Sequence, residues 1–241
     1  MKRWKKVVLG ILVVLVVAVG ALAVWQRSNL TALYSALTKD RETLSQELQS
    51  KVDEHQEALA GSGVTVTAPS AQLNEDLLDG KVSAEEVKEA LGLLTQTSGA
   101  ADSVPAGGQS GGSGTGQASQ TSGSSAAAEA LLNQCVAELY SLQVDLMAQL
   151  GTMKQAAVDQ WVALPAEERT SAKKQEIGMA GLQECYDLEA ETDGEVQGIL
   201  AKYRSKLENL GADASTLDDL WVYYCEEKEA QKAFYLNKYL N

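Results

Sequence analysis

The stretch from Leu131 to Pro165, LLNQCVAELYSLQVDLMAQLGTMKQAAVDQWVALP, decides the fold class of this 241-residue chain. Its apolar side chains return every three or four residues, the repeat that places side chains on one face of an α-helix. The pattern predicts one long helix from Ala126 to Leu164, which ends at Pro165 because proline lacks an amide hydrogen. The apolar stripe consists of Leu132, Cys135, Val136, Leu139, Leu142, Leu146, Leu150, Met153, Ala157 and Leu164.

Two further helices are predicted after this one. Thr170 and Ser171 offer a cap for the second helix, and Gly211 closes it, as glycine does just past helix ends. Ser215 or Thr216 can cap the third helix. Three helices with short connections run up, down and up, so we expect residues 126–241 to form an antiparallel three-helix bundle in an all-α protein. The second stripe is Ile177, Leu182, Cys185, Leu188, Val196, Ile199, Leu200, Tyr203, Leu207 and Leu210, and the third is Leu217, Leu220, Trp221, Tyr224, Phe234, Leu236 and Tyr239.

The three cysteines fall one on each of these helices. Folding the chain about Pro165 places Cys135 ~15 Å along the axis from Cys185, and the same register places it ~9 Å from Cys225. A disulfide needs Cα atoms within about 7 Å, so we expect three free thiols in the monomer. Unpaired thiols fit a reducing or oxygen-poor surrounding, and an intermolecular bridge stays open as an alternative.

The second predicted helix contains four glycines, each of which costs about 1 kcal/mol relative to alanine in an exposed helix interior. Close approach of a neighbouring helix is the expected reason for keeping them, and a local hinge is the alternative. The four are Gly178, Gly181, Gly194 and Gly198.

Aromatic residues gather in the last predicted helix. Trp221 and Tyr224 lie on its apolar stripe, where we expect them to be buried, but neighbouring aromatic residues on a helix cannot all face one core. Exposed aromatic side chains are frequent anchors of protein interfaces. The candidate partner-docking residues are therefore Tyr223, Tyr235, Phe234 and Tyr239.

Residues 98–125 are rich in glycine and serine and show no apolar repeat, which predicts a flexible, disordered linker. The preceding residues 61–97 are expected to form a short helix-turn-helix region, in which Ser83 and Glu86 make a capping box. The stretch Glu75–Glu86 also partly resembles a calcium-binding EF-hand loop. Leu77 stands at a ligand position of that loop, however, so the helix-turn-helix is the favoured reading.

Residues 26–60 carry leucines at three- and four-residue steps and are expected to form an amphipathic or coiled-coil stalk that offers a surface for a homo-oligomer. The one histidine of the chain, His55, interrupts this stripe. No second histidine or cysteine lies near it in the sequence, so we interpret it as a partly exposed stripe residue and not as a metal ligand.

The uncharged residues 7–25 are long enough to cross a bilayer: nineteen residues in a helix span ~28 Å. Trp4 and Trp25 flank them as interfacial anchors, and basic residues precede them, which predicts a signal anchor with residues 1–6 in the cytoplasm and the C-terminal part outside. The alternative is a signal peptide cleaved before Val24, which would make the protein secreted.

The charge balance excludes some partners. The formal net charge is −13, and without the four basic residues before the apolar segment there remain 16 basic against 33 acidic groups, a net charge of −17. Such a body repels nucleic acids. With one histidine and three cysteines the chain is poor in catalytic and metal-binding groups, and no Glu-x-x-His pair indicates a di-iron site. We therefore expect no enzyme activity, no cofactor and no metal.

Two segments carry a resemblance. LPAEERTSAKKQEIG (Leu164 to Gly178) and EKEAQKAFYLNKYLN (Glu227 to Asn241) resemble recurring segments of a group of membrane-anchored helical, coiled-coil proteins of anaerobic Gram-positive bacteria. The resemblance implies a location and an architecture, and it implies no reaction.

Together these observations predict a non-enzymatic, single-pass envelope protein that acts as an extracytoplasmic scaffold or protein-interaction module for another envelope protein. The alternative is an extracytoplasmic sensor or ligand-binding module. A sensor normally needs a cytoplasmic output domain, and residues 1–6 are too few to form one.

Overall fold

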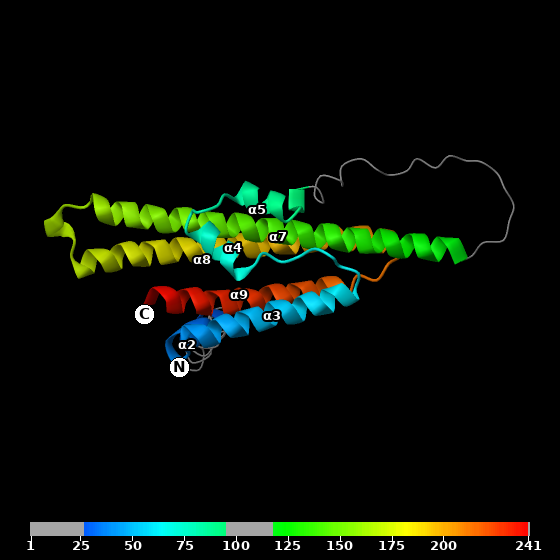
Figure 1. Cartoon of the computed structure of the whole chain (residues 1–241), viewed down its shortest axis with the longest axis horizontal. Helices are drawn as coiled ribbons and strands as arrows, with labels where there is room; N and C mark the ends of the chain where they lie inside the picture. Colours follow the sequence, from blue (N-terminus) through cyan, green and yellow to red (C-terminus); the bar gives the residue numbers. More distant parts are fainter. Residues whose placement is uncertain (1–26, 95–117, 241) are drawn as a thin grey trace, which may run out of the picture. The chain divides into compact units, whose positions relative to one another are not determined.

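The computed structural model describes residues 27–94 and 118–240, and every regular element in this part of the chain is helical. The all-α prediction is thus confirmed. The predicted cytoplasmic residues 1–6 and membrane segment 7–25, together with most of the predicted linker, lie outside the described residues. The α-helices are α2 (Arg27–Thr38), α3 (Arg41–Gly61), α4 (Ala71–Leu78), α5 (Ala84–Ala90), α7 (Ala118–Ala163), α8 (Ser171–Asn209) and α9 (Thr216–Leu240) (Figure 1).

Several helix ends form as their local sequence predicts. Ser83 and Glu86 make the expected capping box at the start of α5. Thr170 caps α8 by accepting a hydrogen bond from the backbone N–H of Lys173. Gly211 follows the last turn of α8 with a φ of 67°, a left-handed conformation that glycine adopts without strain.

The chain forms two compact units. One combines the residues up to His55 with those from Val222 onward, and the other comprises Gln56–Trp221. The second unit is therefore inserted, in sequence, between the two parts of the first. This division differs from the predicted bundle of residues 126–241, because most of α9 belongs with α2 and α3.

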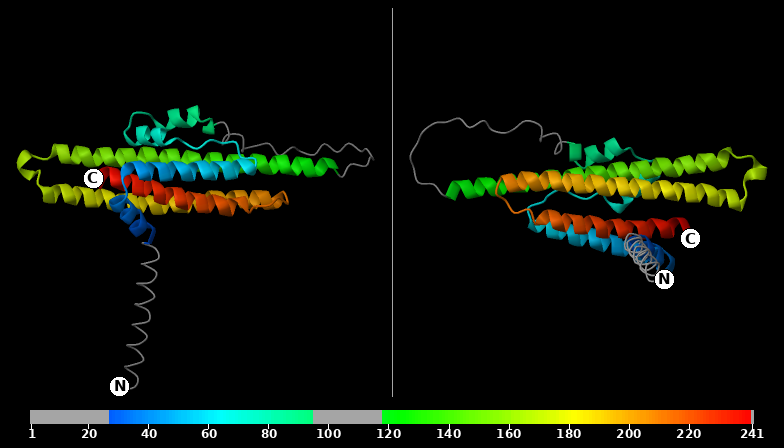
Figure 2. Two further views of the ribbon diagram at one scale, coloured as in Figure 1. Left: turned by 60° about the horizontal axis from the view of Figure 1, so that its bottom comes forward. Right: turned by 180° about the vertical axis from the view of Figure 1, so that it is seen from behind.

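In the unit Gln56–Trp221, α7 and α8 lie side by side and antiparallel along their length (Figure 2). Lys202 Nζ of α8 lies 2.7 Å from Glu138 Oε1 of α7, whereas folding about Pro165 would place residue 192 opposite Glu138. The predicted register is wrong because the chain does not turn at Pro165: it continues through a 3₁₀ turn, Ala166–Glu168, to the cap at Thr170.

The short helices α4 and α5 pack on α7 in the same unit. Lys88 of α5 forms an ion pair with Asp145, and Asp79 at the end of α4 forms one with Lys154. These contacts join residues on both sides of the predicted linker 98–125. The described residues on both sides of that stretch therefore belong to one unit, and α7 begins at Ala118, inside the predicted linker.

Glycines have opposite surroundings in α7 and α8. A Cβ atom on Gly151 of α7 would lie 2.8 Å from the backbone oxygen of Leu77 and 3.0 Å from that of Leu78, so α4 approaches α7 closely at this point. A Cβ on any of the four glycines of α8 would meet nothing within 4 Å. Close helix approach, the expected reason for Gly178, Gly181, Gly194 and Gly198, is therefore wrong for these positions.

The other unit contains α2, most of α3 and most of α9, with α9 antiparallel beside α3 (Figure 1). The predicted continuous stalk is interrupted: α2 ends at Thr38, and Asp40 caps α3 by accepting hydrogen bonds from the backbone N–H and the hydroxyl of Thr43. The core of this unit gathers side chains from all three helices, namely Ala32, Leu44, Ala233 and Phe234, with Tyr235 and Leu236 partly buried against them.

None of the helices in the described part of the chain is both long and apolar enough to cross a membrane.

Candidate functional site

The structure distributes the predicted docking residues over two places in α9. Phe234 is only 6% exposed, and Tyr235 packs edge-on against it with ring centroids 5.2 Å apart. Tyr223 stacks on the imidazole ring of His55 in α3. The side chain of Tyr239 lies outside the described part of the chain. Phe234 is thus a core residue and not a surface anchor, because Ala32 of α2 and Leu44 of α3 cover it. Trp221 and Tyr224, expected in the core, are only partly buried.

A buried polar site surrounds His55 on α3. His55 is only 4% exposed, so the expectation of a partly exposed histidine is wrong. Its Nδ1 lies 2.7 Å from Oε1 of Glu227, and its Nε2 lies 3.4 Å from Oε2 of Glu226. The ring of Tyr223 stacks on the imidazole with a centroid distance of 4.1 Å. Each ring nitrogen therefore faces a carboxylate of α9.

The two carboxylates of this site have different surroundings. Glu226 also accepts a hydrogen bond from Lys51 Nζ at 2.7 Å, and this hydrogen bond is the main reason why the pKa of Glu226 is lowered. Glu227 is more buried, with 16% of its side chain exposed, and this burial raises its pKa despite the hydrogen bond with His55. The site thus joins α3 to α9 through polar contacts of His55 and Lys51 with the two glutamates.

Sequence reasoning misses this site because its members come from opposite ends of the chain. His55 and Glu227 are separated by 172 residues, and no local pattern links them. The only signal in the sequence is His55 itself, a polar residue within an apolar stripe. A polar residue at such a position also occurs where a helix faces solvent, so it does not reveal a buried site.

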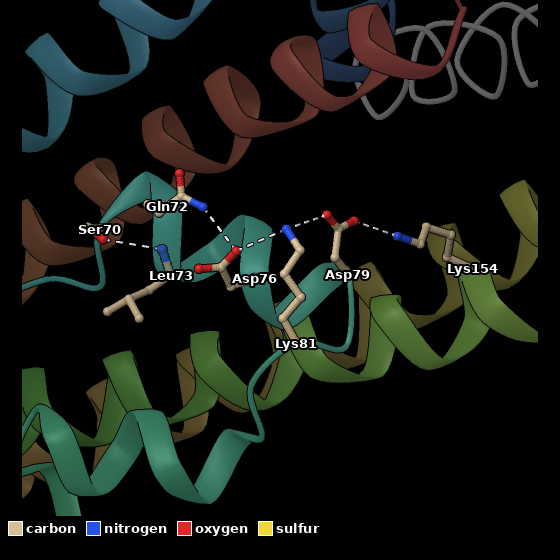
Figure 3. Close-up of polar contacts among 7 residues, drawn as sticks. All are labelled: Ser70, Gln72, Leu73, Asp76, Asp79, Lys81 and Lys154. Atoms are coloured by element: carbon tan, nitrogen blue, oxygen red, sulfur yellow. Dashed lines mark hydrogen bonds and ion pairs between the residues drawn. The ribbon is translucent and has the colours of Figure 1, made fainter.

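The predicted alternative of a calcium loop is not supported by the arrangement between α4 and α5. Lys81 lies between Asp76 and Asp79, and Asp79 also contacts Lys154 of α7 (Figure 3). Asp76 and Asp79 are thus already paired with lysines. The hydrogen bonds of Asp79 with Lys154 and Lys81 lower its pKa to about 2. Glu86, the twelfth position of the loop, is used in the capping box.

No group of three or more histidine, cysteine, aspartate or glutamate side chains suited to a metal ion occurs within residues 27–94 and 118–240. The three cysteines are free thiols: Cys135 is buried, and Cys185 and Cys225 are partly buried. Burial raises the pKa of Cys135 to about 12 and also raises that of Cys185. These thiols are poor nucleophiles in the folded protein.

A second feature is an apolar patch near the C-terminal end of α7. Val158 and Val162 are 46% and 59% exposed, and the partly buried Trp161 lies between them in sequence. Helical periodicity puts both valines on the same face as Gly151, the face that holds α4. Glu138, which contacts α8, lies on the opposite face. The surface of α7 that binds α4 therefore continues beyond it, uncovered at Val158 and Val162.

Comparisons with protein-family models, with curated proteins and with solved structures find no match to this chain.

Proposed function

We propose that the chain is a non-enzymatic, single-pass envelope protein that acts as an extracytoplasmic scaffold and captures an amphipathic helix of a partner protein. The observation that carries this proposal is the apolar patch Val158–Trp161–Val162 on α7. A surface helix that presents an apolar face in water gains free energy when another apolar face covers it.

The neighbouring helix α4 indicates the kind of partner. It is a short amphipathic helix, and its last turn lies on α7 directly at Gly151. The patch continues the same face of α7, so a second amphipathic helix fits there by the same packing. Trp161 adds a large side chain of the type that dominates binding energy at interfaces.

The location rests on the apolar segment 7–25 and on the resemblance to membrane-anchored helical proteins of anaerobic Gram-positive bacteria. The described chain begins with α2 at Arg27, two residues after Trp25, so the first unit would stand next to the membrane surface. Residues 56–221, inserted between the two parts of that unit, supply the capture surface.

Site-specific photocrosslinking in the intact envelope tests the capture surface. A photoreactive amino acid replaces Trp161 in one strain and Val222, a 48% exposed valine of α9, in the control strain. We expect the first probe to give one dominant adduct whose crosslinked peptide is an amphipathic helix, and the control to give none of it. The adduct should disappear in the variant Val158→Ser with Val162→Ser and persist in Val222→Ser. Equal adducts from both probes would contradict the proposal.

Intact mass of the protein extracted from membranes tests the anchor separately. Retention of residues 1–25 supports the single-pass arrangement. A mature chain that begins at Val24 would show that the protein is secreted and would leave the capture surface to be judged by the crosslinks alone.

A further inference from the structure

The helix α2 places its small apolar side chains inward and its large ones outward. Ala32 and Ala36, one turn apart, are 2% and 0% exposed. Tyr34 and Leu37 are 70% and 62% exposed. Helical periodicity puts Tyr34 opposite the two alanines and Leu37 on the outer side beside it. α2 thus presents two large side chains with apolar surface on a face that the rest of the described chain leaves uncovered.

This face of α2 offers little to water. α2 contains no acidic residue, although the chain has 33. The hydroxyl of Thr38, one turn after Tyr34, donates a hydrogen bond to the backbone carbonyl of Tyr34 at 2.7 Å, so it is satisfied within the helix. Tyr34 itself combines an apolar ring with a polar hydroxyl, a combination that is enriched at membrane–water interfaces. The face is therefore suited to the headgroup region of a bilayer.

The preceding sequence indicates what covers this face. The uncharged segment 7–25 ends at Trp25, two residues before α2 begins and nine residues before Tyr34. If this segment spans the bilayer, as we propose, α2 begins at the membrane surface. The one charged residue of α2 is Arg27, a cation, which is attracted to the phosphate groups of anionic lipids. The surface that the chain itself brings to the outer face of α2 is thus a bilayer.

The length of α2 decides how it would lie on that surface. At ~1.5 Å per residue, Tyr34 and Leu37 are ~10 Å and ~15 Å from Arg27 along the helix axis. The interfacial layer outside the hydrocarbon is only about 5 to 8 Å deep. A helix along the membrane normal would carry both side chains beyond this layer, whereas a helix in the membrane plane keeps both within it. The break between α2 and α3 allows this direction, and Figure 2 shows the two helices at an angle.

We propose that α2 is an interfacial helix, which lies in the plane of the outer membrane surface with Tyr34 and Leu37 inserted among the lipid headgroups. The inference rests on the proposed membrane anchor and does not need the capture of a partner by α7. Because α2 shares a core with Phe234 of α9, the lipid contact holds the whole first unit at the bilayer and not only its first helix.

Spin labels at single sites in the full-length chain, reconstituted in nanodiscs of phosphatidylethanolamine and phosphatidylglycerol, test this inference. A ketone-bearing amino acid that carries the label replaces Tyr34, Leu37 or, as a control in the same unit, Val222, which is 48% exposed and fifteen residues from the α2 contact at Asn237. Oxygen concentrates in lipid and a nickel chelate in water, so the ratio of their effects on relaxation reports lipid exposure. We expect this ratio to be several-fold higher at positions 34 and 37 than at 222.

A charge substitution gives a matched test of insertion. With the label at position 34, Leu37→Glu should lower the ratio to the value at 222, because a carboxylate resists entry into the membrane interface, and Val222→Glu should leave it unchanged. Leu37 is exposed, so its replacement should leave the helical circular dichroism as in the wild type.

The outcomes separate this inference from the anchor on which it rests. Labels at 34 and 37 that the nickel chelate reaches as easily as at 222, in a chain that stays in the nanodisc with residues 1–25 retained by intact mass, would overturn the interfacial helix alone. Labels shielded from both reagents would show that a protein surface covers α2 and would also overturn it. A chain that does not stay in the nanodisc would contradict the anchor and the interfacial helix together.

Discussion

Asn237, in the last turns of α9, donates a hydrogen bond from Nδ2 to the backbone carbonyl of Ala36 in α2, at 2.8 Å and across 201 residues of sequence. The same nitrogen reaches the carbonyl of Lys39 at 3.0 Å. The last carbonyls of a helix have no N–H partner within it. A side chain from the far end of the chain therefore caps α2.

Replacing this cap should destabilise the first unit. Asn237 is buried, so Asn237→Ala leaves two carbonyls without a donor, and we expect a loss of about 1 to 3 kcal/mol in the free energy of unfolding. Asn237→Asp should cost more, because it removes the donor and adds a negative charge at the negative end of a helix. Urea unfolding of the full chain measures both, with Asn209→Ala, at the exposed end of α8, as control. Equal midpoints for Asn237→Ala and the control would show that the cap contributes nothing.

The glycines of α7 and α8 should respond oppositely to the same substitution. Gly151→Ala places a methyl group 2.8 Å from a backbone oxygen of α4, so α4 must shift and stability should fall by about 1 to 3 kcal/mol. Gly178→Ala meets open space and should raise stability by up to about 1 kcal/mol, because alanine restricts the unfolded chain. Thermal melts of the two variants form a matched pair. The same sign for both would contradict the close approach of α4 to α7.

The ion pair that ties α4 to α7 should weaken in acid. The pKa of Asp79 is lowered from 3.8 to about 2 by its hydrogen bonds with Lys154 and Lys81, so its contribution is complete above pH 4 and is lost as the pH falls through about 2. The pair is partly exposed, so we expect an effect of at most about 1 kcal/mol. Hydrogen exchange of residues 71–78 should increase in Asp79→Asn at pH 7, and this variant should show no further increase at pH 2.5. If the exchange rate of these amides in the wild type, corrected for the intrinsic pH dependence of exchange, stays constant down to pH 2, the ion pair of Asp79 does not stabilise α4.

The thiols should react in an order set by burial. Cys135 is buried, with a pKa of about 12, so at pH 8 it has almost no thiolate and is shielded from reagents. We expect a thiol reagent to modify Cys135 last in the native protein, and to count three thiols in the unfolded, unreduced chain. Mass mapping of the modified peptides gives the order. A count of one after unfolding would require a disulfide that the folded chain does not contain.

Local features of this fold could be predicted from the sequence, because they depend on residues a few positions apart. Ser83 and Glu86 lie three residues apart and form a capping box in any helix that begins there. The left-handed turn at Gly211 follows likewise from glycine alone. The long stripe from Leu132 onward predicts α7 because it repeats with the period of a helix.

The partners of the helices could not be predicted in the same way. Apolar stripes predict that a helix packs, but they do not say against which neighbour, and the shortest connection favours the next helix in sequence. Phe234 instead packs against Leu44, and Lys51 reaches Glu226 across 175 residues. The predicted register of α7 and α8 was wrong for a related reason. A connection that is longer by a few residues shifts every contact along the helix pair.

The candidate site follows the same division. The acidic pair Glu226 and Glu227 is visible in the sequence, but its meaning depends on an imidazole that only the folded chain brings near. Tyr223 looked like an interface residue because adjacent aromatic residues on a helix point in different directions. Its partner turned out to be the ring of His55, which shares its unit.

The insertion of residues 56–221 between α3 and α9 sets an order of events during synthesis. α2 and α3 are translated early, but the helix that completes their core and caps α2 is the last of the described helices to be made. At ~5 to 20 residues per second the ribosome needs on the order of ten seconds or more to cover the intervening stretch. Meanwhile Leu44 and His55 lack their partners, whereas α4, α5, α7 and α8 can assemble as soon as α8 is complete. A nascent chain stalled before Val222 should therefore present a folded hairpin next to an unfinished N-terminal unit.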